Sequence, residues 1–162
     1  MKLNRNLEPG ILEHYSNLLE ENQLPSEFGG SYMISFTGEH VLKSPINDSP
    51  KNFDKSRKSL LHEYRIGIEA EKIGIEVPKV SAVYLQKGEL PFLVMETKDL
   101  TNYEDLTISE QNEFDIQYRE QLSLAIKHRL MPDDVSKLLN SAWDSENEVV
   151  VFYDFEHWSK MN

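Results

Sequence analysis

The sequence predicts an α+β fold, because strand-like segments occur in runs that are interrupted by single helices. Apolar residues recur at helical spacing in three segments, residues 10–22, 56–73 and 108–130. Strand-like segments lie between them, at residues 32–43 and 77–96, and a last strand that ends at Asp154 is expected from Val149. This order favours an antiparallel sheet with one packed helix, followed by a smaller helical part.

Each element has local signals at its ends. Pro9 stands at the entrance of the first helix, and a Thr37–Glu39 turn joins two strands of a hairpin. Gly74 and Pro78 end the second helix, because glycine favours the C-terminal cap position and proline cannot continue a helix. A turn at residues 86–89 separates the strands predicted at 77–85 and 90–96. A helical turn is predicted at Ser136–Ser141.

Composition and charge exclude several classes of function. The 162 residues carry 28 acidic and 17 basic side chains, a formal charge of −11. We expect no nucleic-acid partner, since phosphate repels such a chain and its basic cluster at Lys51–Lys58 lacks interleaved aromatic residues. No apolar run reaches the roughly 18 residues of a membrane span. With no recognisable signal peptide and no cysteine, the chain is expected to be cytoplasmic, without a membrane partner.

Three charged residues stand where phosphoryl transfer would need them. Lys43 ends a predicted strand, Glu63 lies in the next helix and Asp154 ends the last strand. A lysine held by a helix glutamate can reach phosphate oxygens, and a carboxylate can carry Mg²⁺. The alternatives are a solvated Lys43, a turn cap for Asp154, and Glu69 or Glu71 in place of Glu63.

This order of elements and residues resembles the protein-kinase-like fold, including the aminoglycoside and choline phosphotransferases. The segment His40–Lys43 is similar to the strand that carries the phosphate-contacting lysine, and Glu63 to the helix glutamate. Pro91–Thr97 resembles the strand that enters the hinge. The resemblance implies that backbone groups near Glu96 and Thr97 hold adenine.

The second half of the resemblance concerns the phosphate and metal residues. Asp154-Phe-Glu156 resembles the metal-binding Asp-Phe-Gly motif, and Asp134 and Asn140 would stand for the catalytic aspartate and a metal-binding asparagine. Gly29 and Gly30 occupy the place of the phosphate-cradling loop, although they do not form Gly-x-Gly-x-x-Gly. Asn140 follows Asp134 by six positions where the family has five. The alternative for Asp134 is an N-cap of the helical turn at Ser136–Ser141.

The resemblance implies two lobes, a sheet lobe with a leading helix at residues 1–98 and a reduced helical lobe at residues 99–162. Only eight residues follow Asp154, so we expect no activation segment. The expected function is binding of ATP with Mg²⁺, with phosphate transfer to a small molecule or a docked partner. A degenerate kinase-like module that binds a protein without catalysis is the alternative.

Overall fold

A computed structural model describes residues 1–46 and 53–162 of the chain. The basic cluster predicted from Lys51 onward therefore begins outside the described residues. The chain divides into two compact units. Unit 1 comprises Met1–Tyr64 and Val80–Thr97, and unit 2 comprises Arg65–Lys79 and Lys98–Asn162.

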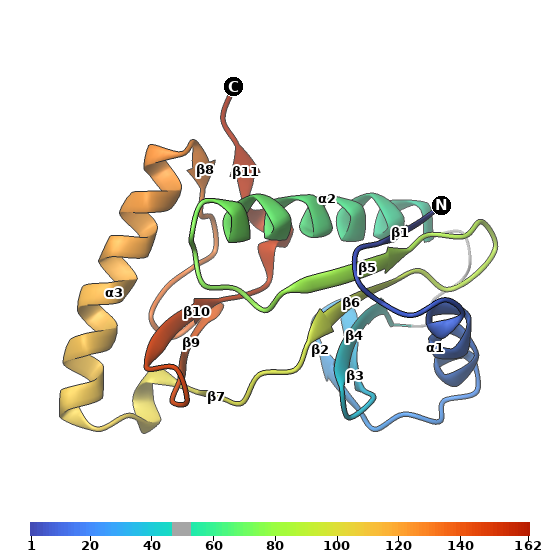
Figure 1. Ribbon diagram of the computed structural model, residues 1–162, viewed down its shortest axis with the longest axis horizontal. Helices are drawn as coiled ribbons and strands as arrows, with labels where there is room; N and C mark the ends of the chain where they lie inside the picture. Colours follow the sequence, from blue (N-terminus) through green and yellow to red (C-terminus); the bar gives the residue numbers. More distant parts are fainter. Residues whose placement is uncertain (47–52) are drawn as a thin grey trace. The chain divides into compact units, whose positions relative to one another are not determined.

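Unit 1 is built on a six-stranded antiparallel sheet with the strand order β1-β5-β6-β4-β3-β2 (Figure 1). The strands are β1 Lys2–Asn4, β2 Ser26–Gly29, β3 Tyr32–Phe36, β4 His40–Pro45, β5 Val80–Tyr84 and β6 Phe92–Glu96. Both predicted hairpins, β3–β4 and β5–β6, are confirmed. The second strand of the first hairpin is longer than predicted, because it continues past Lys43 to Pro45.

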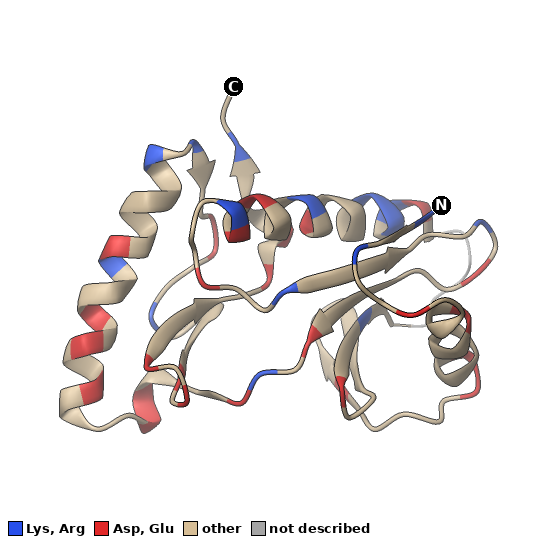
Figure 2. Ribbon diagram, in the orientation of Figure 1, with Lys and Arg blue, Asp and Glu red and all other residues tan. Residues whose placement is uncertain are grey.

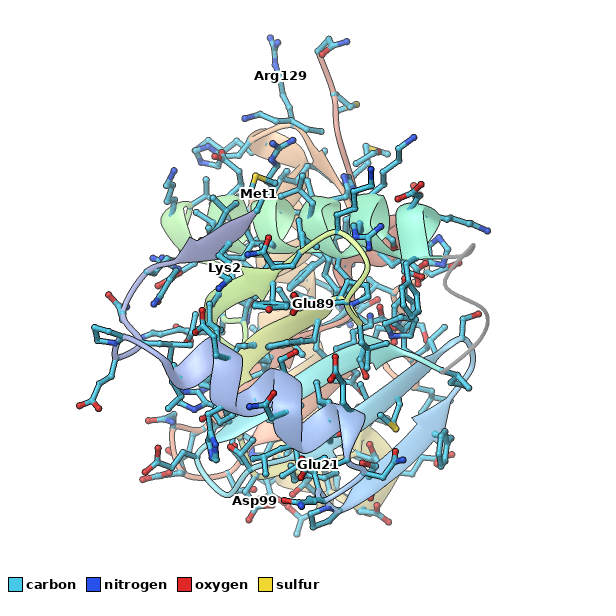
Figure 3. The ribbon with its side chains drawn as sticks, turned by 90° about the vertical axis from the view of Figure 1, so that its right-hand side faces the viewer. Met1, Lys2, Glu21, Glu89, Asp99 and Arg129 are labelled. Carbon is cyan, nitrogen blue, oxygen red and sulfur yellow. The ribbon has the colours of Figure 1, made fainter. Side chains whose placement is uncertain are left out.

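The N-terminal segment adds two features to this sheet. Strand β1, which begins at Lys2 directly after Met1, is an edge strand of the sheet and pairs with β5 (Figure 3). Helix α1, Ile11–Glu20, covers one face of the sheet, and Lys2 forms an ion pair with its Glu13. The apolar side of α1 packs on the sheet in one core cluster, whose buried members are Leu12, Tyr15, Leu19, Leu42, Ala82, Tyr84, Phe92 and Val94.

Neighbouring side chains of β4 point to opposite faces of the sheet, because side chains alternate along a strand. Leu42 is fully buried in the cluster under α1. Lys43 therefore points to the other face, where its ammonium meets Glu63 of helix α2, Phe53–Lys72. The sheet thus places one lysine in a buried position next to a helix.

Unit 2 contains helix α3, Ile108–Lys127, with a three-stranded sheet of order β10-β9-β7 and a strand pair β11-β8. Its short elements are β7 Leu100–Thr101, the 3₁₀ turn η2 Tyr103–Asp105, β8 Leu130–Met131, β9 Ser141–Asp144, β10 Val149–Phe152, the 3₁₀ turn η3 Phe155–His157 and β11 Ser159–Lys160. Thr107 and Glu110 form a capping box that fixes the start of α3. Acidic side chains outnumber basic ones along α3, whose outer side is solvated (Figure 2).

Aromatic rings build the core of unit 2. The cluster includes Phe114 of α3, Trp143 of β9, Phe152 of β10, Phe155 at the start of η3 and Trp158 directly after it. Trp158 is among the largest fully buried side chains of the described residues, with 1% of its surface exposed. The last structural elements of the chain are therefore anchored by apolar burial, which favours a defined backbone around them.

Two predictions about unit 2 are wrong. The segment Ser136–Ser141 is not a helical turn; Ser136 and Leu139 form an isolated β-bridge, and β9 begins at Ser141. Asp134 has φ 56° and does not cap a helix. The last strand ends at Phe152, so Asp154 lies two residues beyond it and is half-buried rather than buried.

No helix in residues 1–46 and 53–162 is long and apolar enough to cross a membrane.

Candidate functional site

The strongest feature of unit 1 is an ion pair between Lys43 and Glu63. Lys43 Nζ lies 2.8 Å from Glu63 Oε2, and the two side chains are only 6% and 2% exposed. The ammonium also lies 4.7 Å from the centre of the Tyr32 ring, a cation–π distance. The predicted partner is therefore present, and the pair is buried on the face of the sheet opposite α1.

The competing acids do not take this place. Glu69 pairs with Lys160 at 3.3 Å and with Lys72 at 3.5 Å, and both of these lysines are more than half exposed. Glu71 is half-buried, two positions further along α2. Glu63 is buried because α2 turns this position toward the sheet, next to the fully buried Leu60 one turn earlier.

The predicted phosphate loop is a tight hairpin turn between β2 and β3. Gly29 pairs with Tyr32, so only Gly30 and Ser31 form the turn. Gly30 has φ 58°, a backbone conformation that glycine adopts without strain. No heavy atom lies within 4 Å of a Cβ built on either glycine, so the tip has open space around it. The backbone at this tip can approach a ligand closely.

The predicted hinge residues lie at the end of β6. Glu96 is the last residue of the strand, where it pairs with His40 of β4, and Thr97 follows it as an exposed residue. Thr97 is also the last residue of unit 1, since Lys98 begins the second segment of unit 2. The chain therefore passes from one unit to the other at the position where the resemblance expects an adenine-binding hinge.

In unit 2 the structure brings Asp134 and Asn140 together. Asn140 Nδ2 donates a hydrogen bond of 2.9 Å to the Asp134 carbonyl oxygen. The residues between them form a narrow turn, in which Ser141 Oγ donates to the Ser136 carbonyl at 2.6 Å. Leu138 and Leu139 at the tip of this turn are 66% and 52% exposed. The one additional residue between Asp134 and Asn140, relative to the family's spacing, is thus accommodated by a turn with exposed apolar side chains at its tip.

Asp154 is tied to the same region through its neighbour. The Tyr153 amide donates a 3.1 Å hydrogen bond to the Asn140 carbonyl oxygen, which places Asp154 next to the Asp134–Asn140 segment. Burial, and then the charge of Asp154, raise the pKa of Tyr153. Three of the predicted site residues are therefore neighbours within unit 2.

These three residues share an uncommon backbone conformation. Asp134, Asn140 and Asp154 have φ values of 56°, 59° and 60°, in the left-handed region that non-glycine residues seldom adopt. Aspartate and asparagine tolerate this region better than other residues. Such strain persists only when its surroundings hold it, and it is commonest at functional sites.

Asn140 and Asp154 carry side-chain oxygens of the kind that a magnesium ion prefers as ligands. The amide nitrogen of Asn140 donates to the Asp134 carbonyl, so the amide oxygen of Asn140 could act as a metal ligand. Asp154 carries a carboxylate. Mg²⁺ prefers oxygen ligands and usually binds through one or two carboxylates together with substrate phosphates. Within the described residues there is no group of three or more His, Cys, Asp or Glu side chains that could hold a metal by themselves. The set therefore fits an ion that a phosphate helps to bind.

One buried acid was not recognised from the sequence. Asp144 accepts a hydrogen bond from Lys98 Nζ at 3.1 Å and three more from the backbone of Glu146 and from Asn147. Burial alone would raise its pKa, but the hydrogen bonds from Asn147 and Lys98 outweigh burial, and the pKa of Asp144 lies below its ordinary value. The polar turn that follows β9 was the available signal, since aspartate commonly accepts from the backbone two residues on.

A second residue missed by sequence reasoning is His157. It lies at the end of η3, three residues after Asp154, with Nε2 at 3.5 Å from Asp134 Oδ2. A histidine without metal-ligand spacing gave no signal in the sequence.

Comparison with solved structures identifies the fold as kinase-like. No protein-family model and no curated protein matches the sequence. The bifunctional kinase-methyltransferase WbdD has a TM-score of 0.60 and 17% identity over 100% of this chain and 34% of its own. A second WbdD structure, at 2.2 Å, has a TM-score of 0.61 and 19% identity over 85% and 33% of the two chains. The Cydia pomonella granulovirus kinase PK-1 has a TM-score of 0.57 and 13% identity over 93% and 58%.

The predicted fold class is thereby confirmed: the protein has a small kinase-like fold. The chain spans about a third of the length of the WbdD structures that it matches.

Proposed function

We propose that the protein binds ATP with Mg²⁺ and transfers the terminal phosphoryl group to a hydroxyl-bearing acceptor. The observation that carries this proposal is the buried pair of Lys43 and Glu63. Removing two charges from water costs several kcal/mol per ion, so a buried ion pair contributes little to stability compared with an apolar pair. Its presence in a kinase-like fold is better explained by a need for an ammonium at a fixed position.

In this proposal Lys43 contacts phosphate oxygens and Glu63 holds the ammonium in place. The Gly29–Gly30 turn brings backbone N–H groups close to the phosphates, and backbone groups at Glu96 and Thr97 bind adenine. Catalysis of phosphoryl transfer consists mainly of positioning and charge neutralisation, which these groups provide.

Asp154 and the amide oxygen of Asn140 would hold the magnesium ion. When bound, Mg²⁺ neutralises charge on the phosphates. Asp134 is the proposed base that accepts the proton of the acceptor hydroxyl. Its carboxylate is 60% exposed, so an acceptor can reach it from solution.

A second candidate function is the binding of a protein partner without catalysis. The turn between Asp134 and Asn140 favours it, because two exposed leucines at one turn tip are an apolar contact point on a polar surface. The partner would then bind at the catalytic-loop position. A measurement of nucleotide binding distinguishes the two proposed functions only in part. A measurement of phosphate release from ATP distinguishes them fully.

The test is calorimetric titration of the wild-type protein with Mg-ATP, and with ATP in the presence of EDTA. We expect binding that weakens at least tenfold without the metal, and an equal loss in Asp154→Asn. Asp105→Asn is the matched control, since it makes the same chemical change at an exposed acid of unit 2. No heat of binding at millimolar Mg-ATP would contradict the proposal. Equal affinity of Asp154→Asn and the wild type would remove Asp154 from the site.

A further inference from the structure

The histidine that ends η3 lies within reach of the proposed base. His157 Nε2 is 3.5 Å from Asp134 Oδ2, although 22 residues separate the two in the chain. Both side chains are more than half exposed, at 57% and 60%. Because both side chains are exposed, their proximity depends on the positions of the two backbone segments that carry them.

The backbone around His157 is fixed by the core of unit 2. Phe155 and Trp158 are 3% and 1% exposed, and their rings meet edge to face with centroids 4.9 Å apart. The Trp158 amide also donates to the Phe155 carbonyl at 3.1 Å. Between these two anchors Glu156 is half-buried and the imidazole of His157 is exposed. His157 therefore projects from a rigid turn.

Asp134 has a fixed backbone but a carboxylate that can rotate. Its carbonyl accepts from Asn140 Nδ2, and its φ of 56° is held by that turn. An exposed aspartate normally samples several rotamers. The contact of His157 Nε2 with Oδ2 at 3.5 Å favours one of these rotamers, because an imidazole nitrogen that carries hydrogen can donate to a carboxylate oxygen.

We infer that His157 is a positioning residue for Asp134. The inference rests on the proposed function and deepens it by assigning the group that orients the base. The turn that carries the proposed metal ligand Asp154 also carries this group, so one short segment sets the positions of both. In the reaction, the acceptor O–H bond breaks and its proton passes to Asp134. The acceptor oxygen bonds to the γ-phosphorus, and the bond to the bridging oxygen breaks with its electron pair leaving on ADP.

Hydrolysis of ATP provides the test, because water is then the acceptor and no acceptor needs to be known. We expect His157→Ala to lower kcat about tenfold with little change in the KM for Mg-ATP, since positioning of a base acts on the chemical step. His157→Gln should recover much of this loss, because its side-chain amide can also donate to Oδ2. His128→Ala is the matched control: His128 is an exposed histidine at the C-terminal cap of α3, and its replacement should leave kcat unchanged.

A double-mutant cycle tests whether His157 acts through Asp134. Asp134→Asn should lower kcat further than His157→Ala, and the combination should be no slower than Asp134→Asn alone. Additive losses, or wild-type kcat in His157→Ala, would overturn the inference while the proposed function stands.

The thermal shift with Mg-ATP is measured in every variant. No shift in the wild type would overturn the proposed function and this inference together. A shift without any hydrolysis by the wild type would overturn the inference and leave nucleotide binding in place.

Discussion

The two units hold their functional side chains in different ways. In unit 1, Lys43 and Glu63 are buried and their charges meet at 2.8 Å. In unit 2, Asp134, Asn140 and Asp154 lie at or near the surface, and a left-handed backbone conformation sets their positions. A functional group can be preorganised by burial or by backbone constraint, and the cost of a substitution depends on which is used. Substitutions in unit 1 should therefore affect stability most, and those in unit 2 should affect chemistry most.

The largest effect is expected for Lys43→Met. This change leaves the buried Glu63 carboxylate without the ammonium that faces it, which should lower the free energy of unfolding by about 3–5 kcal/mol. Urea denaturation followed by circular dichroism measures the change. The matched control is Lys72→Met on the same helix as Glu63, where the lysine is 65% exposed and little change is expected. The double variant Lys43→Met/Glu63→Leu should recover much of the loss. A loss below about 1 kcal/mol in the free energy of unfolding of Lys43→Met would contradict the conclusion that burial holds the functional side chains of unit 1 in place.

The next largest effect concerns the buried acid of unit 2. Asp144→Asn keeps the shape of the side chain but removes its charge, which faces Lys98, so we expect a loss of about 1.5–3 kcal/mol at neutral pH. Because the pKa of Asp144 is lower in the folded state, its contribution is present above its unfolded pKa and is lost as the pH falls through the folded pKa. The wild type should therefore lose more stability than Asp144→Asn between about pH 4 and pH 2. Parallel pH profiles of unfolding would contradict this.

A smaller effect tests the backbone constraint in unit 2. Asn140→Ala and Asn140→Gly both remove the amide that donates to Asp134, but only alanine is strained at φ 59°. We expect the alanine variant to be about 1 kcal/mol less stable than the glycine variant. Thermal unfolding of the two variants gives the difference directly. Equal stabilities would show that the left-handed conformation at this position is not maintained.

The smallest effect is expected at the surface pair Lys160–Glu69. Its side chains are 59% and 37% exposed, and water screens such pairs. Lys160→Ala should change the free energy of unfolding by less than about 0.5 kcal/mol, and the difference should shrink with added salt. A loss above 1 kcal/mol, measured in the same denaturation assay, would mean that exposed charges matter more in unit 2 than this account allows.

The helices and the central strands could be predicted because their residues follow a clear spacing. Leu12, Tyr15 and Leu19 recur at helical intervals and pack on the sheet as expected. Lys43 and Glu63 were recognised because Lys43 ends a predicted strand and Glu63 lies in the helix that follows it, in an order that suits phosphoryl transfer. The order of the elements then led to a kinase-like fold, which the solved structures confirm.

Other parts could not be predicted, for physical reasons. Strand β2 is exposed at every position and β1 has three residues, so neither shows the alternation of a half-buried strand. The helical turn predicted at Ser136–Ser141 is not formed, and Leu138 and Leu139 are the exposed tip of a narrow turn. The nearness of His157 to Asp134 depends on the aromatic anchors Phe155 and Trp158, and tertiary packing of this kind leaves no local pattern.

The measurement that tests the central claim most directly is the melting temperature of the wild-type protein with and without millimolar Mg-ATP. A ligand at about 100 times its dissociation constant stabilises the folded state by roughly 2.7 kcal/mol, which corresponds to a rise of roughly 5–10 °C for a chain of this size. We predict such a rise, and a clearly smaller one in Asp154→Asn. An unchanged melting temperature at millimolar Mg-ATP would contradict nucleotide binding, and with it the proposed roles of Lys43, Glu63 and Asp154.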